Sequence, residues 1–394
     1  MKISIFCEDL FMPKSLLALL SLFCSAKNIF DMRTKKYLNY ILNPFDLLRT
    51  KKVLQVNPTA EPNRKEPEQS VISVFEYSKE KVVCSAITKI EDAFKYLHSP
   101  SNTWINIDGL RKDDVEKICA HFNIHPLIAE DILSLGQRPK TDEIDGLLFC
   151  LLNMLLFDEK NGSVETEQVS IILGKNFVIS FQEEAETDPF NSLRDKLKIT
   201  STKVRQNSSD FLFYSLLDYI VDHYFVVMEK MGEKIELLEE DIIKNSNNRS
   251  LVKINMLRKE MIVLKRSIAP VRELLNGIMR SDTDLIEEKT EKYFKDVYDH
   301  IIQAYDLSEN YRDMITNLQD LYLSNVNLRM NEVMKVMAIV TCLLAPATVI
   351  GGIFGMNFEA IPMLHNKWGF FISVGLMLFI PIIMIRSFRK RGWF

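Results

Sequence analysis

Gly355, Met356 and Asn357 follow one another directly after an apolar run, and their types suit a site that recognises a hydrated cation. Gly351 and Gly352 crowd the end of the same run. Small residues let backbones approach closely and expose carbonyl oxygens, so irregular backbone can line a water path at membrane depth. Neutral amide and carbonyl oxygens hydrogen-bond the water shell of an ion without holding the ion too tightly to leave. The tripeptide therefore predicts a selectivity filter.

A stripe of residues leads up to this tripeptide at steps of three or four, which places its members on one side of a helix. Its polar members suit a hydrated ion, and its methionines can form an apolar gate that excludes water. Any helix offers some stripe at this spacing, so the prediction depends on the tripeptide that follows. The predicted pore-lining residues are Asn331, Met334, Met337, Thr341, Ala345, Thr348 and Gly352.

Two apolar runs must position these residues, at 336–353 and 368–385. Each has about 18 residues, near the ~20 that a helix needs to cross a bilayer. The interval 358–367 is too short for a domain, so the runs predict a helical hairpin. Cations directly after the second run place the C-terminus and the large N-terminal part in the cytoplasm. These cations are Arg386, Arg389, Lys390 and Arg391.

Helical periodicity begins at residue 210 and continues into the membrane part. It predicts helices at 210–244, 251–280 and 285–354. The last would have about 70 residues and a length of about 105 Å, at 1.5 Å per residue. Such a helix would connect the pore directly to the soluble part and transmit its movements.

Residues 71–200 mix short β-rich runs with helical ones, so the predicted fold class is α+β, with an α/β domain before the long helices. The expected strands are 70–77, 102–107, 147–157 and 169–182, the last folded as a hairpin, and the expected helices are 113–122 and 126–135. The predicted divisions are an N-terminal extension and linker (1–57), the α/β domain (58–205), an antiparallel helix pair (206–284), a stalk (285–335), the first span with the tripeptide (336–357), an outer loop (358–367), the second span (368–385) and a basic tail (386–394).

Composition excludes several classes of function. The chain has 394 residues and a net charge of −4, so no nucleic-acid partner is expected. Its six cysteines lack CxxC spacing, and helix-breaking residues separate His121 from His125, so neither set predicts a zinc site. No nucleotide loop, nucleophile elbow or hydrolase motif is present, so we expect no enzyme activity. The apolar run 15–24 has the length of a signal peptide, but a cleaved signal would export the soluble part and contradict the topology above. We therefore favour a non-essential extension or a misplaced start codon, with an interfacial helix as the alternative.

From about residue 58 to the C-terminus, the sequence resembles the CorA magnesium channels. Phe354-Gly355-Met356-Asn357 ends the first of the two C-terminal helices, and Asn331-Glu332-Val333-Met334-Lys335-Val336 begins it. Further matching motifs are Trp104-Ile105-Asn106, Ile124-His125-Pro126-Leu127, Glu130-Asp131-Ile132, Gln137-Arg138-Pro139-Lys140 and Tyr298-Asp299-His300.

The resemblance implies a homopentamer in the bacterial inner membrane that takes up Mg²⁺, and in some members Co²⁺ or Ni²⁺. It also implies that Glu130 and Asp131 of one subunit meet Asp296 of the next and bind regulatory Mg²⁺. Bridging of these carboxylates would hold the ring closed at high cytoplasmic Mg²⁺. Asp320 matches an acid at the inner mouth of the pore.

Three residues depart from the family pattern. Ala345 stands where a bulky apolar residue is usual, Phe354 replaces a tyrosine, and Met363 replaces a loop acid. Two alternatives remain open: a zinc transporter of the ZntB type, which shares the hairpin, and a membrane-anchored coiled-coil scaffold that conducts nothing. The intact tripeptide favours Mg²⁺ over zinc.

Overall fold

The computed structural model describes residues 66–67, 69–183, 189–245, 247–281, 283–358, 361–363 and 366–392. The chain divides into two units, Met1–Asn57 and Pro58–Phe394. The N-terminal extension, with its apolar run, lies outside the described residues, so both interpretations of it stay predictions. The fold below is that of the second unit.

A seven-stranded mixed sheet forms the first part of this unit, in the order β2-β1-β3-β7-β6-β5-β4. Only the β3–β7 pair is parallel. The strands are β1 Val71–Tyr77, β2 Val82–Ile87, β3 Asn102–Asp108, β4 Lys140–Ile144, β5 Leu147–Asp158, β6 Ser163–Leu173 and β7 Phe177–Gln182.

The sequence prediction missed the two edge strands and placed the start of β6 too late. β2 and β4 lie at the ends of the sheet, and the β4 sequence KTDEI has no buried residue. β6 begins at Ser163 rather than 169, because its first half carries exposed Glu165. A strand in which apolar and polar residues do not alternate gives no period-two pattern from which it could be predicted. The predicted β6–β7 hairpin is confirmed.

Each face of the sheet has its own apolar core. Val74 and Ile105 point to the face covered by η2 (Ile90–His98), α2 (Lys112–His121) and α3 (Pro126–Leu133). Their neighbours Phe75 and Trp104 point to the other face, which α4 (Asn191–Lys198) and the long helices cover. This alternation follows from the period of two residues in a strand.

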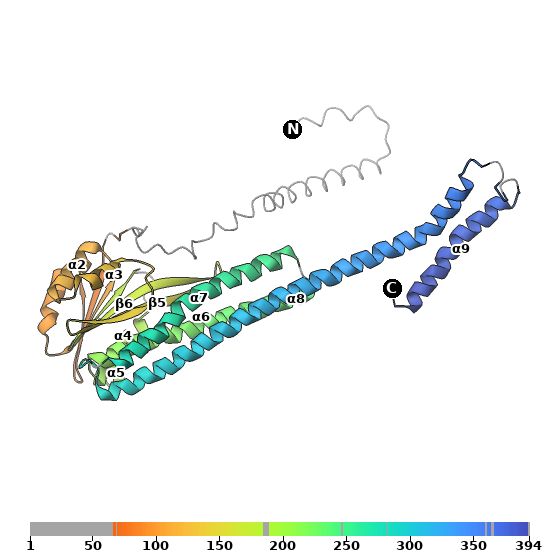
Figure 1. Cartoon of the computed structure of the whole chain (residues 1–394). Coiled ribbons are helices and arrows are strands. Elements are labelled where there is room, and N and C mark those ends of the chain that lie inside the picture. Colours follow the sequence, from red (N-terminus) through yellow and green to blue (C-terminus); the bar gives the residue numbers. More distant parts are fainter. Residues whose placement is uncertain are drawn as a thin grey trace, which may run out of the picture. The chain divides into compact units, whose positions relative to one another are not determined.

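Three long helices pack beside the second face (Figure 1). A short helix, α5 (Lys203–Gln206), leads into α6 (Ser209–Asn245). The helix α7 (Asn248–Arg280) begins where the Asn247 side chain accepts hydrogen bonds from the backbone N–H groups of Arg249 and Ser250. α8 (Glu288–Phe354) contacts both α6 and α7, through buried residues that include Phe294, Ile301 and Leu318. The first half of α8 is therefore part of a three-helix group with α6 and α7.

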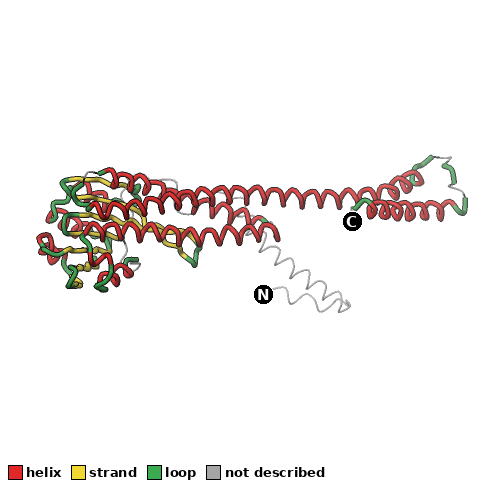
Figure 2. Tube along the Cα trace, turned by 90° about the horizontal axis from the view of Figure 1, so that it is seen from below, coloured by secondary structure: helices red, strands yellow, loops and turns green. Residues whose placement is uncertain are grey.

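α8 is one continuous helix of 67 residues, close to the predicted 285–354. Figure 2 shows it leaving the other two long helices before it meets α9 (Gly369–Lys390), which runs back alongside it. At 1.5 Å per residue its length is about 100 Å.

Within the described residues, three helices are long and apolar enough to cross a membrane: α6, α8 and α9. The apolar window of α6 is 67% buried inside the protein, so that helix is part of a soluble core. The windows of α8 and α9 are only 6% buried. Their exposed apolar surfaces fit a bilayer, as the predicted hairpin requires.

Candidate pore face and metal centre

The membrane half of α8 has two different faces. One packs against α9 and contains buried Ile339, followed by half-buried Leu343, Pro346 and Ile350. At 100° per residue, the predicted stripe lies on the opposite side of the helix. All seven of its residues are exposed in the single chain: Asn331, Met334, Met337, Thr341, Ala345, Thr348 and Gly352.

The two threonines of this stripe are held by the helix backbone. The Thr341 hydroxyl donates to the Met337 carbonyl oxygen at 2.9 Å, and the Thr348 hydroxyl donates to the Leu344 carbonyl oxygen at 3.0 Å. With their protons committed to the helix, both hydroxyls keep lone pairs that accept hydrogen bonds from water. Such acceptors suit a cation that still carries its water shell.

Gly355 ends α8 and leaves little room for a larger residue. Its N–H donates to the Gly351 carbonyl oxygen at 3.0 Å, and a Cβ atom on Gly355 would lie only 3.1 Å from that oxygen. Asn357 follows outside the helix, is exposed, and makes no hydrogen bond to another described residue. Its amide oxygen therefore faces solvent at the end of the stripe. The outer-loop acid Glu359 lies outside the described residues.

The predicted regulatory acids lie on separate parts of the subunit. Asp131, half-buried on α3, accepts from the Lys140 ammonium group at 2.5 Å, and its neighbour Glu130 is exposed. Asp296 is exposed on α8. Because α3 and α8 cover opposite faces of the sheet, one subunit does not bring Asp131 and Asp296 together.

Asp320, also exposed on α8, precedes Asn331 by eleven residues, which is about three helical turns. It therefore lies on the same side of α8 as the stripe. A carboxylate here would face the continuation of the pore axis toward the soluble part.

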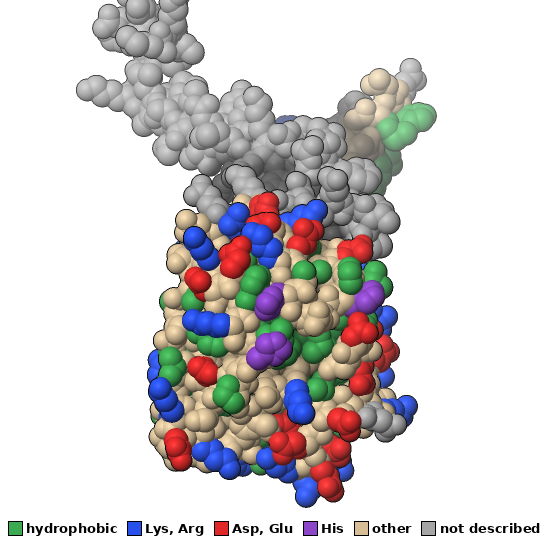
Figure 3. Space-filling view, turned by 90° about the vertical axis from the view of Figure 1, so that its left-hand side faces the viewer, with side chains coloured by type: hydrophobic (Ala, Val, Ile, Leu, Met, Phe, Trp, Pro, Cys, Tyr) green, Lys and Arg blue, Asp and Glu red, His purple; other side chains and the backbone are tan. Residues whose placement is uncertain are grey.

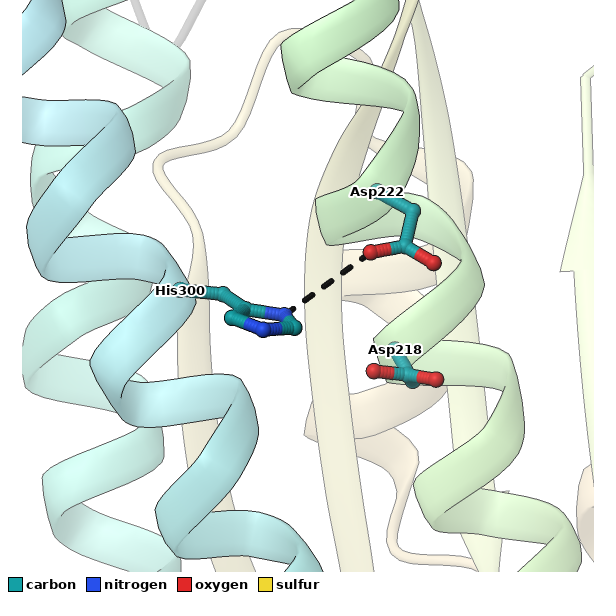
Figure 4. A group of neighbouring side chains, drawn as sticks. All are labelled: Asp218, Asp222 and His300. Carbon is teal, nitrogen blue, oxygen red and sulfur yellow. Dashed lines mark ion pairs between the residues drawn. The ribbon is translucent and has the colours of Figure 1, made fainter.

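A cluster that the sequence prediction missed joins α6 to α8. Asp218 and Asp222 on α6 and His300 on α8 each have a possible ligand atom within 4.8 Å of the others (Figure 4). The His300 Nδ1 atom is 3.8 Å from an Asp222 carboxylate oxygen, is itself buried, and has no hydrogen-bond partner. Two carboxylates and an imidazole are a suitable set for a divalent cation.

Asp218 is the most perturbed acid of this cluster. Burial raises its pKa, and the charge of Asp222 raises it further. The charge of Asp296 acts in the same direction, so the predicted regulatory acid belongs to the same electrostatic surroundings. A bound cation would relieve this repulsion.

The sequence carried two separate signals for the cluster: the pair Asp218 and Asp222, four residues apart on an otherwise apolar part of α6, and His300 within the family-like motif Tyr298-Asp299-His300. His300 is far away in the sequence and reaches the pair only through the packing of α8 on α6.

The histidines predicted to be structural make local contacts. His121 stacks on Phe94 with ring centroids 4.1 Å apart, and His125 accepts a hydrogen bond from the Leu127 backbone N–H at the start of α3. The end of the sheet unit mixes both signs of charge around histidine and hydrophobic side chains (Figure 3). Neither histidine belongs to a metal-like cluster among the residues with assigned positions.

Comparison with known proteins agrees with this architecture. The family model of the CorA-like Mg²⁺ transporter protein matches residues 100–390. The chain is 39% identical over 323 residues to the cobalt/magnesium transport protein CorA of Thermotoga maritima, covering 82% of this chain and 92% of that protein. It is 32% identical over 300 residues to the putative metal ion transporter YfjQ of Bacillus subtilis, covering 76% and 92%.

Among solved structures, the complete CorA magnesium transporter of Methanocaldococcus jannaschii matches with a TM-score of 0.68 at 23% identity, covering 82% of this chain and 99% of that chain. The full-length CmaX protein matches with a TM-score of 0.63 at 16% identity. These two likenesses support the fold.

The exposed apolar hairpin and the likeness to relatives named as transporters together place the chain among membrane transport proteins. The chain belongs to the CorA-like Mg²⁺ transporter family, whose model covers more than half of it. The predicted family and the α+β fold class are confirmed. The relatives at 39% and 32% identity are named as a cobalt/magnesium transport protein and a putative metal ion transporter, and neither is named as an enzyme.

Proposed function

We propose that the chain assembles as a homopentamer in the bacterial inner membrane and conducts Mg²⁺, and also Co²⁺, into the cytoplasm. One observation carries the proposal. The α8 face opposite α9 is exposed among the described residues, and it presents amide, hydroxyl and methionine side chains that lead to Asn357. A path between such faces requires several copies, because the described part of one subunit supplies only two exposed apolar helices, α8 and α9. Both termini of each subunit would lie in the cytoplasm, since basic residues follow the second span.

Gly355, Met356 and Asn357 would form the selectivity filter. Mg²⁺ gives up its water reluctantly, so a ring of Asn357 amides would recognise the hydrated ion through hydrogen bonds to its water. Thr341 and Thr348 would accept from the same shell farther along the pore. Met334 and Met337 would narrow the pore and exclude water when it closes. Transport would be driven by the membrane potential, at about 2.3 kcal/mol per charge per 100 mV.

Regulation would use cytoplasmic Mg²⁺ between subunits. Asp131 and Glu130 of one subunit would approach Asp296 of the next, and a bound ion would offset the repulsion of their charges. Lys140 already pairs with Asp131 within the subunit, so Mg²⁺ would have to displace that ammonium group. This competition would keep the affinity low enough for release when cytoplasmic Mg²⁺ falls.

The zinc-transporting alternative has less support. The relatives at 39% and 32% identity are named as a cobalt/magnesium transporter and a putative metal ion transporter. Asn357 and the threonines offer neutral oxygens, whereas zinc is usually held by nitrogen and sulfur ligands.

Ion flux into proteoliposomes tests the proposal. We expect the purified protein to conduct Mg²⁺ and the Asn357→Ala variant to lose nearly all Mg²⁺ flux while still assembling. The matched control is Asn366→Ala, which removes another loop asparagine whose side chain accepts from the Trp368 backbone N–H. Flux of Zn²⁺ without Mg²⁺ would support the zinc alternative. No flux of any divalent cation would support the scaffold.

A further inference from the structure

The helices α6, α7 and α8 each contact the other two, so they form a triangular group. In such a group, the outward face of one helix lies opposite the groove between the other two. The outward face of α6 and the outer groove between α7 and α8 therefore point in opposite directions. A ring of identical copies is held together by head-to-tail contacts, and such contacts require two different surfaces on opposite sides of each subunit.

The outward face of α6 is acidic. Its exposed positions recur at steps of three or four residues. Glu233 and Glu240 have local lysine partners, whereas Glu229 and Glu236 have no ion pair with any described residue. Val226 and Leu237 are 53% and 66% exposed among these acids. The face consists of Val226, Glu229, Glu233, Glu236, Leu237 and Glu240.

The outer groove between α7 and α8 is basic with an apolar floor. It is a depression of about 320 Å³ with Met261, Ile262 and Ile315 at its base and Arg258, Lys265 and Arg312 around it. One acid, Glu309, pairs with both Lys265 and Arg312.

The groove therefore keeps an excess of positive charge. The Arg258 guanidinium donates to the neutral Gln319 side chain at 2.6 Å, and no described carboxylate lies within ion-pair distance of it. Lys265 and Arg312 share the Glu309 carboxylate, and Arg312 also pairs with Asp313 at 3.2 Å, so three cations face two acids.

The acidic face and the basic groove lie at the same height along the helices. A Cβ atom on Gly232 of α6 would lie only 2.6 Å from the Tyr311 hydroxyl oxygen of α8. Glu229 and Glu233 are therefore level with Arg312, which follows Tyr311. Copies in a ring are related by rotation about the pore axis, and this rotation leaves the position of each residue along the axis unchanged. The acids of a neighbouring copy therefore lie at the same level along the axis as this groove.

We propose that the acidic face of α6 in one subunit docks into the basic α7–α8 groove of the next subunit. The proposal rests on the proposed ring of identical subunits and names the surface that closes it. Val226 and Leu237 would pack toward the apolar floor while Glu229 and Glu236 pair with Arg258 and Arg312. Because the groove includes α8, and α6 carries Asp218 and Asp222, the contact would link the cluster of Asp218, Asp222 and His300 in one subunit to the proposed gate of its neighbour.

Charge reversal tests the contact in the full-length protein in detergent. Glu229→Lys combined with Glu236→Lys, or Arg258→Glu combined with Arg312→Glu, is expected to weaken assembly on the order of tenfold at low salt. The fourfold combination restores opposite charges and is expected to recover the oligomer. The control, Glu116→Lys on α2, makes a similar charge change on an exposed residue outside both surfaces. Oligomer fraction is read by native mass spectrometry, and helix content by circular dichroism.

A second measurement is independent of any effect on stability. Glu233→Cys paired with Arg258→Cys is expected to give intersubunit disulfides under mild oxidation, whereas each single variant gives none beyond the background of the natural cysteines. If the protein conducts Mg²⁺ and assembles normally but the charge reversals change nothing and the cysteine pair does not cross-link, the docking proposal is wrong and the proposed channel stands. A monomer that conducts no ion would overturn both.

Discussion

At the scale of single residues, the orientation of the polar atoms proposed to meet the ion is set by neighbouring residues on one helix. Thr341 and Thr348 give their protons to backbone carbonyls one turn earlier, so their outward lone pairs act only as acceptors. Asn357 lies just beyond the helix end that Gly355 makes possible. The positions of Thr341, Thr348 and Asn357 were predicted from residues close together in the chain, whereas the hydrogen bonds of the two threonines to the backbone come from the structure.

The imidazole of His300 is expected to favour Co²⁺ over Mg²⁺ in the cluster with Asp218 and Asp222. Nitrogen ligands suit first-row transition metals, whereas Mg²⁺ prefers oxygen. His300→Gln should therefore weaken Co²⁺ binding to the purified protein about 10- to 100-fold, a typical effect for a lost metal-site partner. Mg²⁺ binding should change little. Isothermal titration calorimetry with each ion measures both.

His223→Gln is the matched control, since His223 lies on α6 outside the cluster and its ring contacts the Tyr219 carbonyl oxygen. Equal loss of Co²⁺ and Mg²⁺ affinity in His300→Gln would show that His300 only maintains the local structure.

The raised pKa of Asp218 predicts a pH-dependent gain of stability when its charge is removed. Burial and Asp222 raise this pKa above the ordinary value of 3.8, so the folded protein holds the proton more tightly than the unfolded chain. The ionised carboxylate therefore costs stability at neutral pH, and this cost is relieved as pH falls through the folded pKa. Without metal, Asp218→Asn should melt at a higher temperature than the parent near pH 7.5.

The difference in melting temperature between Asp218→Asn and the parent protein should shrink as pH approaches 3.8. Thermal melts in the presence of a chelator between pH 7.5 and 3.8 measure this difference, and Asp299→Asn, at an exposed acid, is the control. A difference that stays constant with pH would mean that the charge of Asp218 is not responsible.

The cluster of Asp218, Asp222 and His300 shows which arrangement of residues could not be predicted from the sequence. Asp218 and His300 are separated by most of α6, all of α7 and the start of α8, and no local pattern joins them. Their approach depends on the packing of α8 beside α6, which is a tertiary property. The tripeptide was recognisable because its residues are adjacent in the chain.

At the scale of elements, α8 joins two environments without a break. Its first half contributes buried residues such as Val297 and Ala304 to the soluble core, and its second half is exposed for membrane and neighbouring subunits. Its length was predictable because helical periodicity and apolar content persist along it. β2 and β4 were not predictable because edge strands need no continuous apolar face.

A proline between the two halves should uncouple them. Asn327 is exposed on α8, two residues beyond Asn325, whose side chain donates to the Ile242 carbonyl oxygen of α6. Asn327→Pro would break one backbone hydrogen bond at a cost of about 3 kcal/mol. We expect the variant to bind Mg²⁺ in its soluble part but to conduct Mg²⁺ at the same rate with high or low internal Mg²⁺. Proteoliposome flux at both internal concentrations measures this, with Asn327→Ala as the control. Normal closure in Asn327→Pro would mean that α8 does not transmit the signal as a rigid rod.

At the scale of the whole molecule, every proposed activity depends on surfaces that one subunit leaves open. The stripe on α8 faces no described element, Asp131 and Asp296 lie on opposite sides of the sheet, and the acidic face of α6 points away from the basic groove. In a ring of copies, all three of these surfaces could be covered by a neighbouring subunit or line the pore. Sequence patterns identify such surfaces poorly, because they report the type and spacing of residues but not the contacts that a residue makes with another copy of the chain.

Closure of the assembled ring should depend on Asp296 if Mg²⁺ binds between subunits. Asp296→Lys replaces the carboxylate with a cation, which would pair with Asp131 or Glu130 of the neighbour and take the place of the ion. We expect this variant to retain Mg²⁺ flux but to respond little to internal Mg²⁺ between low and high concentrations. Flux into proteoliposomes loaded with graded internal Mg²⁺ gives the closure curve.

Asp299→Lys makes the same change at an exposed acid three residues farther along α8 and should keep the parent curve. Because the two substitutions alter net charge equally, only the position of the carboxylate distinguishes them. If Asp296→Lys also kept the parent curve, intersubunit binding at this acid could not be the basis of closure. The cluster of Asp218, Asp222 and His300 would then be the remaining site through which the described residues could sense a divalent cation.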